Sequence, residues 1–468
     1  MPFMQDKIII SSLMNILDRN GVIYDANDLQ FYSRDALDVT RAIPRNFEPK
    51  IPIAVVRPRT ENDVVKVVKF ANKNKIPIVP YGGGTGLMGG AATIKRGIVM
   101  DLKELNHIEI NKEDLTAIAG AGVTMKQLDS ELRKHGLMFA HDPWSASYAT
   151  VGGAICTNGV GYLACKYGSM GEQVLGLRAV TANGSVLDTK PAKKKSSGMD
   201  LKDLVIGSEG VFGIITSATL KAYRIPESEQ VHAFEFDNFE KGYRAVREMF
   251  SLGMKPASLD LFEAYDVGAD PETKLWLQDE PGTRLYVMFD GFKEKVNAES
   301  AKTKSIVRQF GGTELDSSVS NEYWKKRYDI AERYITFIRS KSRNTNIKFD
   351  FVQVSIPAGK LLEFDKACME IASQQKVMVQ GHGIWQAPEF YSMNLFAHNA
   401  KANDRMYDAM DEMLRYASKI GTMEYCHGIG LKLAHLMKEE HSDGIKVMKK
   451  IKRTLDPNNI MNPDKLAL

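Results

Sequence analysis

Glycines that follow a short apolar run are the first residues that could do chemistry. The run Ile76–Tyr81 reads IPIVPY, and Gly82 to Gly86 follow it as GGGTG. Consecutive glycines can adopt positive φ angles, so their N–H groups can converge on one anion, and the missing side chains let a pyrophosphate approach the backbone. A tight surface turn would use the same residue types. This segment alone leaves both interpretations open.

Residues Gly84 to Gly89 also match the pattern G-x-G-x-x-G, which opens a helix in nicotinamide-binding folds. Only residues 91–97 separate these glycines from the next apolar run at 98–102, and that leaves no room for a helix. We therefore reject a nicotinamide-type dinucleotide fold.

Two further segments of small residues favour phosphate binding over a surface turn. Residues 147–161 read SYATVGGAICTNGVG, and residues 203–220 contain Gly207, Gly210 and Gly213. The residues Ile214-Ile215-Thr216, which follow the last of these glycines, could edge a flat ring. Three such segments in one region indicate a long dinucleotide with a planar end.

The elements that must position these segments alternate between strands and helices. Apolar runs predict strands over 51–58, 76–81 and 98–102, while Thr124 and Gln127 form a capping box for a helix over 124–135. The uncharged, glycine-rich residues 149–165 are predicted to be a loop. After Pro226 glycines become rarer and charged helices longer, which predicts a second α+β domain.

The composition excludes several classes of protein. With 62 Lys+Arg against 58 Asp+Glu, the net charge of +4 over 468 residues is no electrostatic footprint for nucleic acid. Four cysteines without a C-x-x-C pair give no support to zinc-ribbon or thioredoxin sites and suit a reducing compartment. The longest uncharged run has too many glycines for a membrane span. We expect a soluble, cytoplasmic enzyme with a small-molecule substrate, no nucleic-acid partner and no transmembrane segment.

These segments resemble the FAD-binding domain of the vanillyl-alcohol oxidase/p-cresol methylhydroxylase (PCMH) superfamily, and most closely its D-lactate dehydrogenase and glycolate oxidase catalytic-subunit flavoproteins. The matching pieces are PYGGGTGL at 80–87, TVGGAICTNGVG at 150–161, LACKYG at 163–168, VIGSEGVFGIITSATLK at 205–221, HGIG at 427–430 and LDPNNIMNPDK at 455–465. The resemblance implies an α+β, two-domain PCMH-type fold. An FAD-binding domain would span 1–225 with its core at 46–225, a cap or substrate domain 226–420, and a C-terminal segment, 421–468, would return to the first domain.

The resemblance also implies which residues hold FAD. The Gly82–Gly86 loop would bind the pyrophosphate, Ile215 and Thr216 would approach the ring, and Asn462 would contact the flavin. The loop has no histidine, so the FAD is expected to be non-covalent. The full set is Tyr81, Gly82, Gly83, Gly84, Thr85, Gly86, Thr150, Gly152, Gly153, Asn158, Gly161, Ile215, Thr216 and Asn462.

Two residues are the expected catalytic pair. Family members carry Gly-Glu-His-Gly-Ile-Gly where this chain has Tyr425-Cys426-His427-Gly428-Ile429-Gly430, and the family histidine is the usual base. Histidine suits that role because its pKa lies near working pH. Arg327, in a W-x-x-R pattern with Trp324, could hold a substrate carboxylate bidentately; a surface salt bridge is the alternative.

The chain departs from the family at the metal and substrate positions. Metal-dependent relatives take two histidines from a G-H-x-G-D-G-N-L-H segment and the glutamate of the motif above. Here the corresponding residues are His382, Glu389 and Cys426, which could in principle bind a divalent metal. If no metal binds, His382 simply lines the pocket. Trp385, Tyr391 and Tyr425 add aromatic surface and favour a bulkier substrate, with His382 in the same pocket.

Three functions remain open. The first is an FAD-dependent dehydrogenase of a hydroxy acid such as D-lactate or glycolate, which would pass electrons to a quinone or an electron-transferring protein. The second is an FAD oxidase or dehydrogenase of a bulkier or aromatic alcohol. The third is a non-redox transferase like the alkylglycerone-phosphate synthases, which carry a run of histidines before the final Gly-x-Gly where this chain has only His427. A homodimer is one possible assembly.

Overall fold

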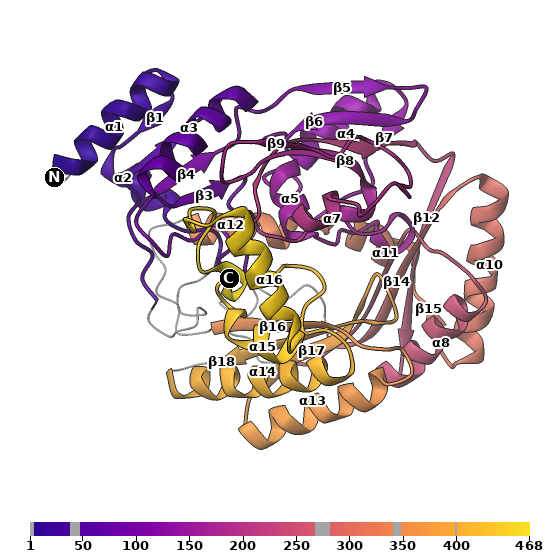
Figure 1. Cartoon of the computed structure of the whole chain (residues 1–468). Helices are drawn as coiled ribbons and strands as arrows, with labels where there is room; N and C mark the ends of the chain where they lie inside the picture. Colours follow the sequence, from indigo (N-terminus) through magenta and orange to yellow (C-terminus); the bar gives the residue numbers. More distant parts are fainter. Residues whose placement is uncertain (1–3, 38–46, 267–280, 340–347, 398–399) are drawn as a thin grey trace. The chain divides into compact units, whose positions relative to one another are not determined.

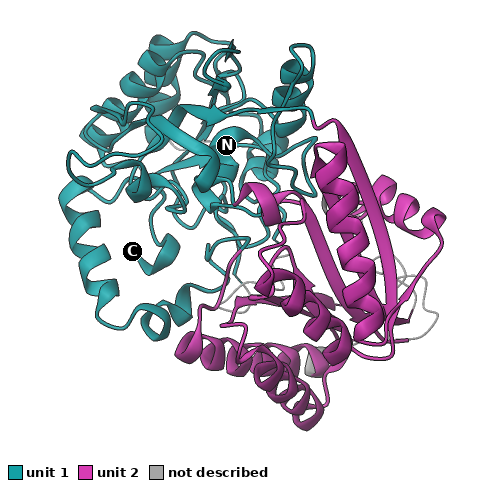
Figure 2. Ribbon diagram, turned by 90° about the vertical axis from the view of Figure 1, so that its right-hand side faces the viewer, with its two compact units in different colours: residues 1–160, 169–225, 426–468 teal, residues 161–168, 226–425 magenta. Residues whose placement is uncertain are grey.

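The structure is a computed structural model that describes residues 4–37, 47–266, 281–339, 348–397 and 400–468. The chain separates into two compact units, coloured teal and magenta in Figure 2. Unit 1 comprises residues 1–160, 169–225 and 426–468, and unit 2 comprises residues 161–168 and 226–425. Within the described ranges, no helix is long and apolar enough to cross a membrane.

Unit 1 contains two main sheets. In the first, of order β1-β2-β4-β3, the strands β2, β4 and β3 are parallel and β1 is antiparallel, so the sheet is mixed. The second, of order β5-β6-β10-β8-β9, is antiparallel throughout. The strands of unit 1 are β1 (Val22–Ile23), β2 (Ala54–Val56), β3 (Ile78–Tyr81), β4 (Ile98–Asp101), β5 (Ile108–Asn111), β6 (Thr116–Gly120), β7 (Leu137–Met138), β8 (Val174–Val180), β9 (Val186–Asp188), β10 (Ile214–Lys221) and β11 (Tyr223–Arg224).

Helices cover these sheets with apolar faces that the sequence encodes. In α3, Val64, Val67, Val68 and Ala71 recur at helical spacing and are fully buried. Thr60 and Thr124 close capping boxes with Asp63 and Gln127 at the starts of α3 and α4, as predicted for Thr124. The helices are α1 (Met4–Leu17), α2 (Ala26–Tyr32), α3 (Glu61–Asn74), α4 (Met125–Arg133), α5 (Val151–Thr157), α7 (Lys202–Val205), α15 (Met437–His441) and α16 (Gly444–Leu455).

One prediction was wrong and one was confirmed among the glycine segments. Residues 82–97, all of them described, form no helix between β3 and β4, which confirms that a nicotinamide-type βαβ unit is absent there. Residues 151–157 form helix α5 rather than a loop. Their small side chains allow the helix to pack closely on the sheet, because a Cβ at Gly152 would lie 2.9 Å from that of Ala121.

Unit 2 is built on one seven-stranded antiparallel sheet of order β15-β12-β14-β13-β17-β18-β16. In Figure 1 the helices α8, α10, α13 and α14 lie along one face of it. Its strands are β12 (Ser228–Phe236), β13 (Ser258–Ala264), β14 (Gly282–Gly291), β15 (Thr313–Glu314), β16 (Lys348–Ser355), β17 (Met378–Trp385) and β18 (Phe390–Ala397). Its helices are α6 (Ala164–Tyr167), α8 (Phe239–Ser251), α10 (Lys293–Gln309), α11 (Ser317–Lys326), α12 (Asp329–Arg339), α13 (Leu361–Gln375) and α14 (Ala400–Ile420).

The two faces of this sheet meet different elements. Leu261 of β13 packs against Gly242 of α8, while its neighbour Asp260 accepts a hydrogen bond from Tyr323 of α11 at 2.7 Å. Successive residues of a strand point to opposite faces. The sheet therefore has a helix face, covered by α8 and α13, and an opposite face, which carries α11.

Candidate active site

The first two glycine segments pack directly against each other in unit 1. A Cβ at Gly82 would collide with Thr150 Oγ1, and one at Gly83 would collide with the carbonyl oxygen of Tyr148. Gly84 has a φ of 67°, and a Cβ there would strike the Tyr81 hydroxyl. The loop that begins after β3 thus requires glycine for close backbone approach, and it leaves a backbone surface at which a pyrophosphate can be bound.

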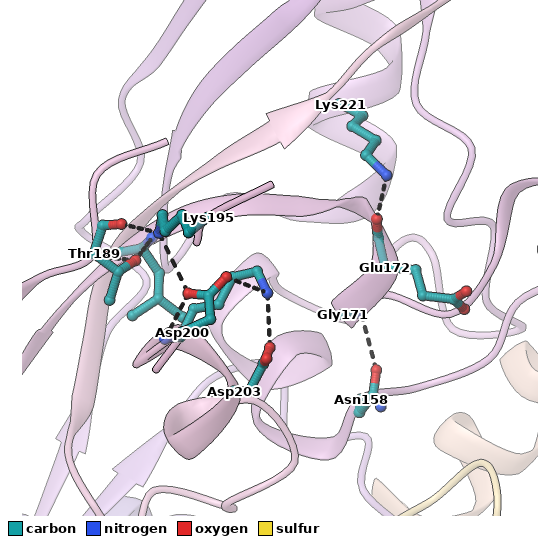
Figure 3. Close-up of polar contacts among 10 residues, drawn as sticks. Asn158, Gly171, Glu172, Thr189, Lys195, Asp200, Asp203 and Lys221 are labelled. Carbon is teal, nitrogen blue, oxygen red and sulfur yellow. Dashed lines mark hydrogen bonds and ion pairs between the residues drawn. The ribbon is translucent and has the colours of Figure 1, made fainter. Parts of the chain in front are cut away.

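Thr150 and Asn158 begin and end the second segment. Thr150 is the N-cap of α5 and accepts the N–H of Gly153 at 3.4 Å. Asn158 ends the helix in the left-handed region, with a φ of 52°, and its Oδ1 accepts the N–H of Gly171 at 2.9 Å (Figure 3). In the same view Lys221 donates to the carbonyl oxygen of Glu172 at 2.6 Å, so residues 171–173 are held from two sides. The side-chain oxygen of Asn158 therefore binds the protein backbone at Gly171.

The third segment, residues 203–220, is hydrogen-bonded to the end of α5. The N–H groups of Gly207 and Glu209 donate to the carbonyl oxygens of Ile155 and Cys156, at 3.0 and 2.9 Å. Further on, Ile215 and Thr216 are buried on β10, and the Thr216 hydroxyl donates to Glu61 at 2.7 Å. The Thr216 side chain is thus directed at α3, and only its backbone remains for contact with a ring.

The turn that carries His427 is held to both outer glycine segments. Gly428 and Gly430 have φ values of 83° and 52°. Glu209 Oε1 accepts the N–H of Ile429 at 2.6 Å and that of Gly430 at 2.9 Å. The N–H of Leu431 donates to the carbonyl oxygen of Met88 at 2.8 Å. His427 itself is half-buried.

Asn462 completes this junction from the C-terminal segment. Its Nδ2 donates to the carbonyl oxygens of Gly90 and Glu209, at 2.8 and 2.7 Å. Its Oδ1 and Glu209 Oε2 are buried acceptors without a hydrogen-bond partner in the described part of the chain. Such acceptors fit a bound group that carries hydroxyl or N–H donors, as FAD does. Asn462 therefore lies where a flavin-binding residue is needed.

A group of buried charges near this junction was not predicted from the sequence. Glu209 is 5% exposed, and burial raises its pKa to about 7. Lys465 is fully buried and donates to the carbonyl oxygen of Ala92 at 2.6 Å, and burial lowers its pKa to about 8. Burial also raises the pKa of Asp35, which accepts the N–H of Ala91 at 3.1 Å. The available signal was one acidic residue inside the apolar, glycine-rich run VIGSEGVFG.

A second missed residue is His141. It is 4% exposed, and burial lowers its pKa to about 4. A Cβ added at Gly159 would lie 3.7 Å from His141 Cε1 and 3.8 Å from the carbonyl oxygen of Cys426. A neutral imidazole is therefore close to the start of the His427 turn.

In unit 2, Arg327 lies among aromatic rings. Its guanidinium carbon is 4.1 Å from the ring centre of Trp324 and 4.2 Å from that of Tyr328. Its Nη1 donates to the carbonyl oxygen of Trp324 at 2.7 Å, and the Tyr162 hydroxyl donates to the carbonyl oxygen of Arg327 at 2.8 Å. Such a cage fixes the plane of the guanidinium.

The predicted pocket residues divide between the two faces of the unit 2 sheet. Trp385 packs edge-on against Tyr162 at 5.5 Å, on the side of Arg327. His382 and Tyr391 instead point to the helix face, where Tyr391 donates to Asp365 of α13 at 2.8 Å. The prediction of one pocket that contains both sets is therefore wrong for His382 and Tyr391. Tyr425 stacks on Phe390 at 4.4 Å, and Gly161 belongs to unit 2 with the Tyr162 side chain.

The predicted metal ligands are not assembled. In the described ranges no three His, Cys, Asp or Glu side chains form a group that could hold a metal ion, so His382, Glu389 and Cys426 do not make a ligand set. Both ring nitrogens of His382 face protein partners, since Nδ1 lies 2.6 Å from Asp365 Oδ1 and Nε2 lies 2.9 Å from the Tyr265 hydroxyl. The contact between Nδ1 and Asp365 does not have the geometry of a hydrogen bond.

Comparisons with known proteins also indicate an FAD site. Residues 52–190 match the family of FAD binding domains, and residues 225–466 match the C-terminal domain of FAD linked oxidases. A D-lactate dehydrogenase from Archaeoglobus fulgidus is 31% identical over 88% of this chain and 91% of its own length. An alkyldihydroxyacetonephosphate synthase from Trypanosoma brucei brucei is 27% identical over 98% of this chain and 80% of its own length.

The fold is shared with solved flavoenzymes of the PCMH type. p-Cresol methylhydroxylase with substrate bound superposes with a TM-score of 0.77 at 17% identity and covers 100% of this chain and 98% of its own. An alkyldihydroxyacetonephosphate synthase structure superposes with a TM-score of 0.78 at 20% identity, over 99% of this chain and 85% of its own. FAD is the cofactor, and the expected two-domain fold is confirmed. The chain belongs to the FAD-linked oxidases of the vanillyl-alcohol oxidase/PCMH superfamily.

Proposed function

We propose that this chain oxidises the CH–OH group of a hydroxy acid of the D-lactate or glycolate class. The observation that carries the proposal is the caged guanidinium of Arg327, because a planar fork of N–H donors held in one plane suits a carboxylate. The D-lactate dehydrogenase from Archaeoglobus fulgidus and the glycolate oxidase subunit GlcD from Bacillus subtilis, which is 27% identical, support the same substrate class.

In this proposal each residue has one task. Arg327 binds the carboxylate and fixes the orientation of the substrate. His427 takes the proton from the hydroxyl group as the C–H bond breaks. Bound FAD would supply the acceptor for the hydride and with it the two-electron chemistry. The glycine segments, Thr150 and Asn462 hold the cofactor. A quinone or an electron-transferring protein as the final acceptor, and a homodimer as the assembly, stay predictions.

Two other functions are compatible with parts of the chain. The rings of Tyr162, Trp324 and Tyr328 around Arg327, with Trp385 packed against Tyr162, favour an aromatic hydroxy acid or a bulkier alcohol. The synthase from Trypanosoma brucei brucei supports a non-redox transfer, although this chain lacks the run of histidines expected of such synthases.

Anaerobic mixing of the holoenzyme with a substrate panel separates the three functions. D-Lactate, glycolate, an aromatic 2-hydroxy acid and an aromatic alcohol without a carboxylate are each added, and loss of the oxidised flavin absorption near ~450 nm is followed. The proposal expects bleaching by at least one hydroxy acid, with L-lactate as a stereochemical control. Bleaching only by the carboxylate-free alcohol would contradict the role of Arg327. No bleaching by any compound would favour the transferase.

A further inference from the structure

We propose that Glu209 is the positioning residue of the His427 turn. Its carboxylate holds the turn in place through two backbone N–H groups, so that His427 keeps its position relative to the glycine segments that hold the cofactor. The inference rests on the proposed function, in which His427 is the base. Glu209 is not expected to touch the substrate, and it acts through the turn that it holds.

The contacts of Glu209 converge on this turn from a fixed origin. One oxygen, Oε1, accepts both the N–H of Ile429 at 2.6 Å and the N–H of Gly430 at 2.9 Å. The backbone of Glu209 is fixed in turn, because its N–H donates to Cys156 at 2.9 Å and its carbonyl accepts Asn462 Nδ2 at 2.7 Å. The side chain therefore transmits the position of the 207–213 segment to residues two and three places after His427.

The turn has no room for another arrangement at this point. Gly428 has a φ of 83°, and a Cβ there would lie 2.5 Å from Glu209 Oε1. A Cβ at Gly430 would collide with the carbonyl oxygen of Met88. Glu209 has a φ of 52°, a left-handed conformation that is strained for a residue with a side chain. Such strain persists where surrounding contacts impose it, and here those contacts come from α5, the His427 turn and Asn462.

A carboxylate is suited to this task, although it is buried. Two N–H donors on one oxygen are a charge-assisted arrangement and favour the ionised form. The groups whose charges act on Glu209 are Lys465, which favours ionisation, and Asp35, which opposes it; the thiol of Cys156 on α5 is a further titratable neighbour. Burial is the largest influence and raises the pKa of Glu209 to about 7. The hold on the turn is therefore expected to weaken as the pH falls below about 7.

We call the two hydrogen bonds from Ile429 and Gly430 to Glu209 the tether. Two substitutions distinguish the loss of the tether from a general loss of stability. Glu209→Ala removes the acceptor, whereas Glu209→Gln keeps an oxygen that can accept the same two N–H groups. The matched control is Asp6→Ala, because Asp6 is an equally buried carboxylate of unit 1 that pairs with Arg96 at 2.7 Å, outside the turn. In each holoenzyme we would measure amide hydrogen exchange at Ile429 and Gly430, the rate of flavin reduction per bound FAD, and the thermal midpoint.

The expected pattern is specific. Glu209→Ala should speed exchange at the two amides at least ~10-fold and slow flavin reduction ~10²-fold, as for a catalytic group displaced by about 1 Å. Glu209→Gln should restore both within ~10-fold, and Asp6→Ala should lower only the thermal midpoint. Unchanged amide exchange or unchanged reduction in Glu209→Ala would overturn the proposal. A Glu209→Gln variant as slow as Glu209→Ala would also overturn it, since the charge rather than the tether would then be the cause.

A failure of the proposed function gives a different result. If no hydroxy acid reduces the wild-type flavin, the substrate assignment fails, and the tether is judged by amide exchange together with the rate at which diethyl pyrocarbonate modifies His427. The tether then predicts an altered modification rate in Glu209→Ala and an unaltered rate in Glu209→Gln and Asp6→Ala. Equal rates in all four proteins would overturn it.

Discussion

The candidate site residues of the two units make contacts of different kinds. In unit 1 the contacts are made by backbone: glycines without room for a Cβ, N–H groups that donate to Glu209, and carbonyl oxygens that accept from Asn462. In unit 2 the contacts are made by side chains, with three aromatic rings around one guanidinium and a fourth ring, that of Trp385, packed on Tyr162. A backbone site tolerates almost no added atom, whereas a side-chain site can change its occupant by substitution. We infer that cofactor binding resides in unit 1 and substrate selection in unit 2.

The largest effect should come from the one side chain of unit 1 that is proposed to do chemistry. His427→Asn keeps a polar group of similar size but removes the base, so flavin reduction should slow by ~10²–10⁴-fold while FAD stays bound. Stopped-flow absorbance under anaerobic conditions measures the rate, and the protein-bound flavin spectrum verifies occupancy. A rate within a factor of two of wild type would remove His427 from the mechanism.

A side chain added at one of the backbone contacts of unit 1 should reduce the amount of FAD that the protein binds. A Cβ at Gly83 would collide with the carbonyl oxygen of Tyr148, which cannot move without β3 or the 148–153 segment. Gly83→Ala should lower stability by about 3 kcal/mol and leave little FAD bound. Gly359→Ala in unit 2 is the control, because nothing lies within 4 Å of its added Cβ. Full FAD content in Gly83→Ala would break the contrast between backbone and side-chain sites.

Acid should weaken unit 1 through His141. Burial lowers the pKa of His141 from 6.5 to about 4, so the unfolded chain binds the extra proton between these values. The stabilisation is complete above about pH 6.5 and is lost as the pH falls through 4, a difference of roughly 3 kcal/mol. Urea unfolding of wild type and His141→Gln across pH 4–7 measures it. Parallel pH curves for the two proteins would show that His141 is not the cause.

The glycine segments could be predicted from the sequence because their function is local. A backbone contact needs glycine at a given position, and glycine is visible in the chain without knowledge of its partners. The charges near the junction were not predictable in this way. Glu209 meets Ile429 across 220 residues, and nothing close to either residue indicates the pairing.

The division of the unit 2 pocket shows a different failure. His382 and Trp385 were placed in one pocket, yet both belong to β17 and are three residues apart. An odd spacing in a strand places two side chains on opposite faces. The spacing was therefore visible in the sequence, but no strand was predicted there. Aromatic side chains alone do not tell which face of a sheet they occupy.

Loss of the guanidinium in unit 2 should weaken substrate binding without harm to the cofactor. Arg327→Ala removes a charged partner of the carboxylate, for which a loss of about 1.5–3 kcal/mol is expected, or roughly a 10- to 150-fold higher KM for hydroxy acids. Arg327→Lys should recover only part of this, because an ammonium does not present the planar fork. Steady-state kinetics with the reducing substrate of the panel measures both. An unchanged KM would place the carboxylate elsewhere and favour a substrate without one.

The smallest effect should come from the helix face of the same sheet. Tyr391→Phe removes the hydroxyl that donates to Asp365 but keeps the ring packed edge-on against Phe364 at 5.4 Å. Asp365 retains its contact with His382, so the loss should be about 1 kcal/mol of unfolding free energy, measured by urea titration. KM and the rate of flavin reduction should stay at wild-type values, in contrast to Arg327→Ala. A changed KM in Tyr391→Phe would mean that the helix face contributes to substrate selection. The selection that we assign to the opposite face, which carries α11, would then belong to both faces of the sheet.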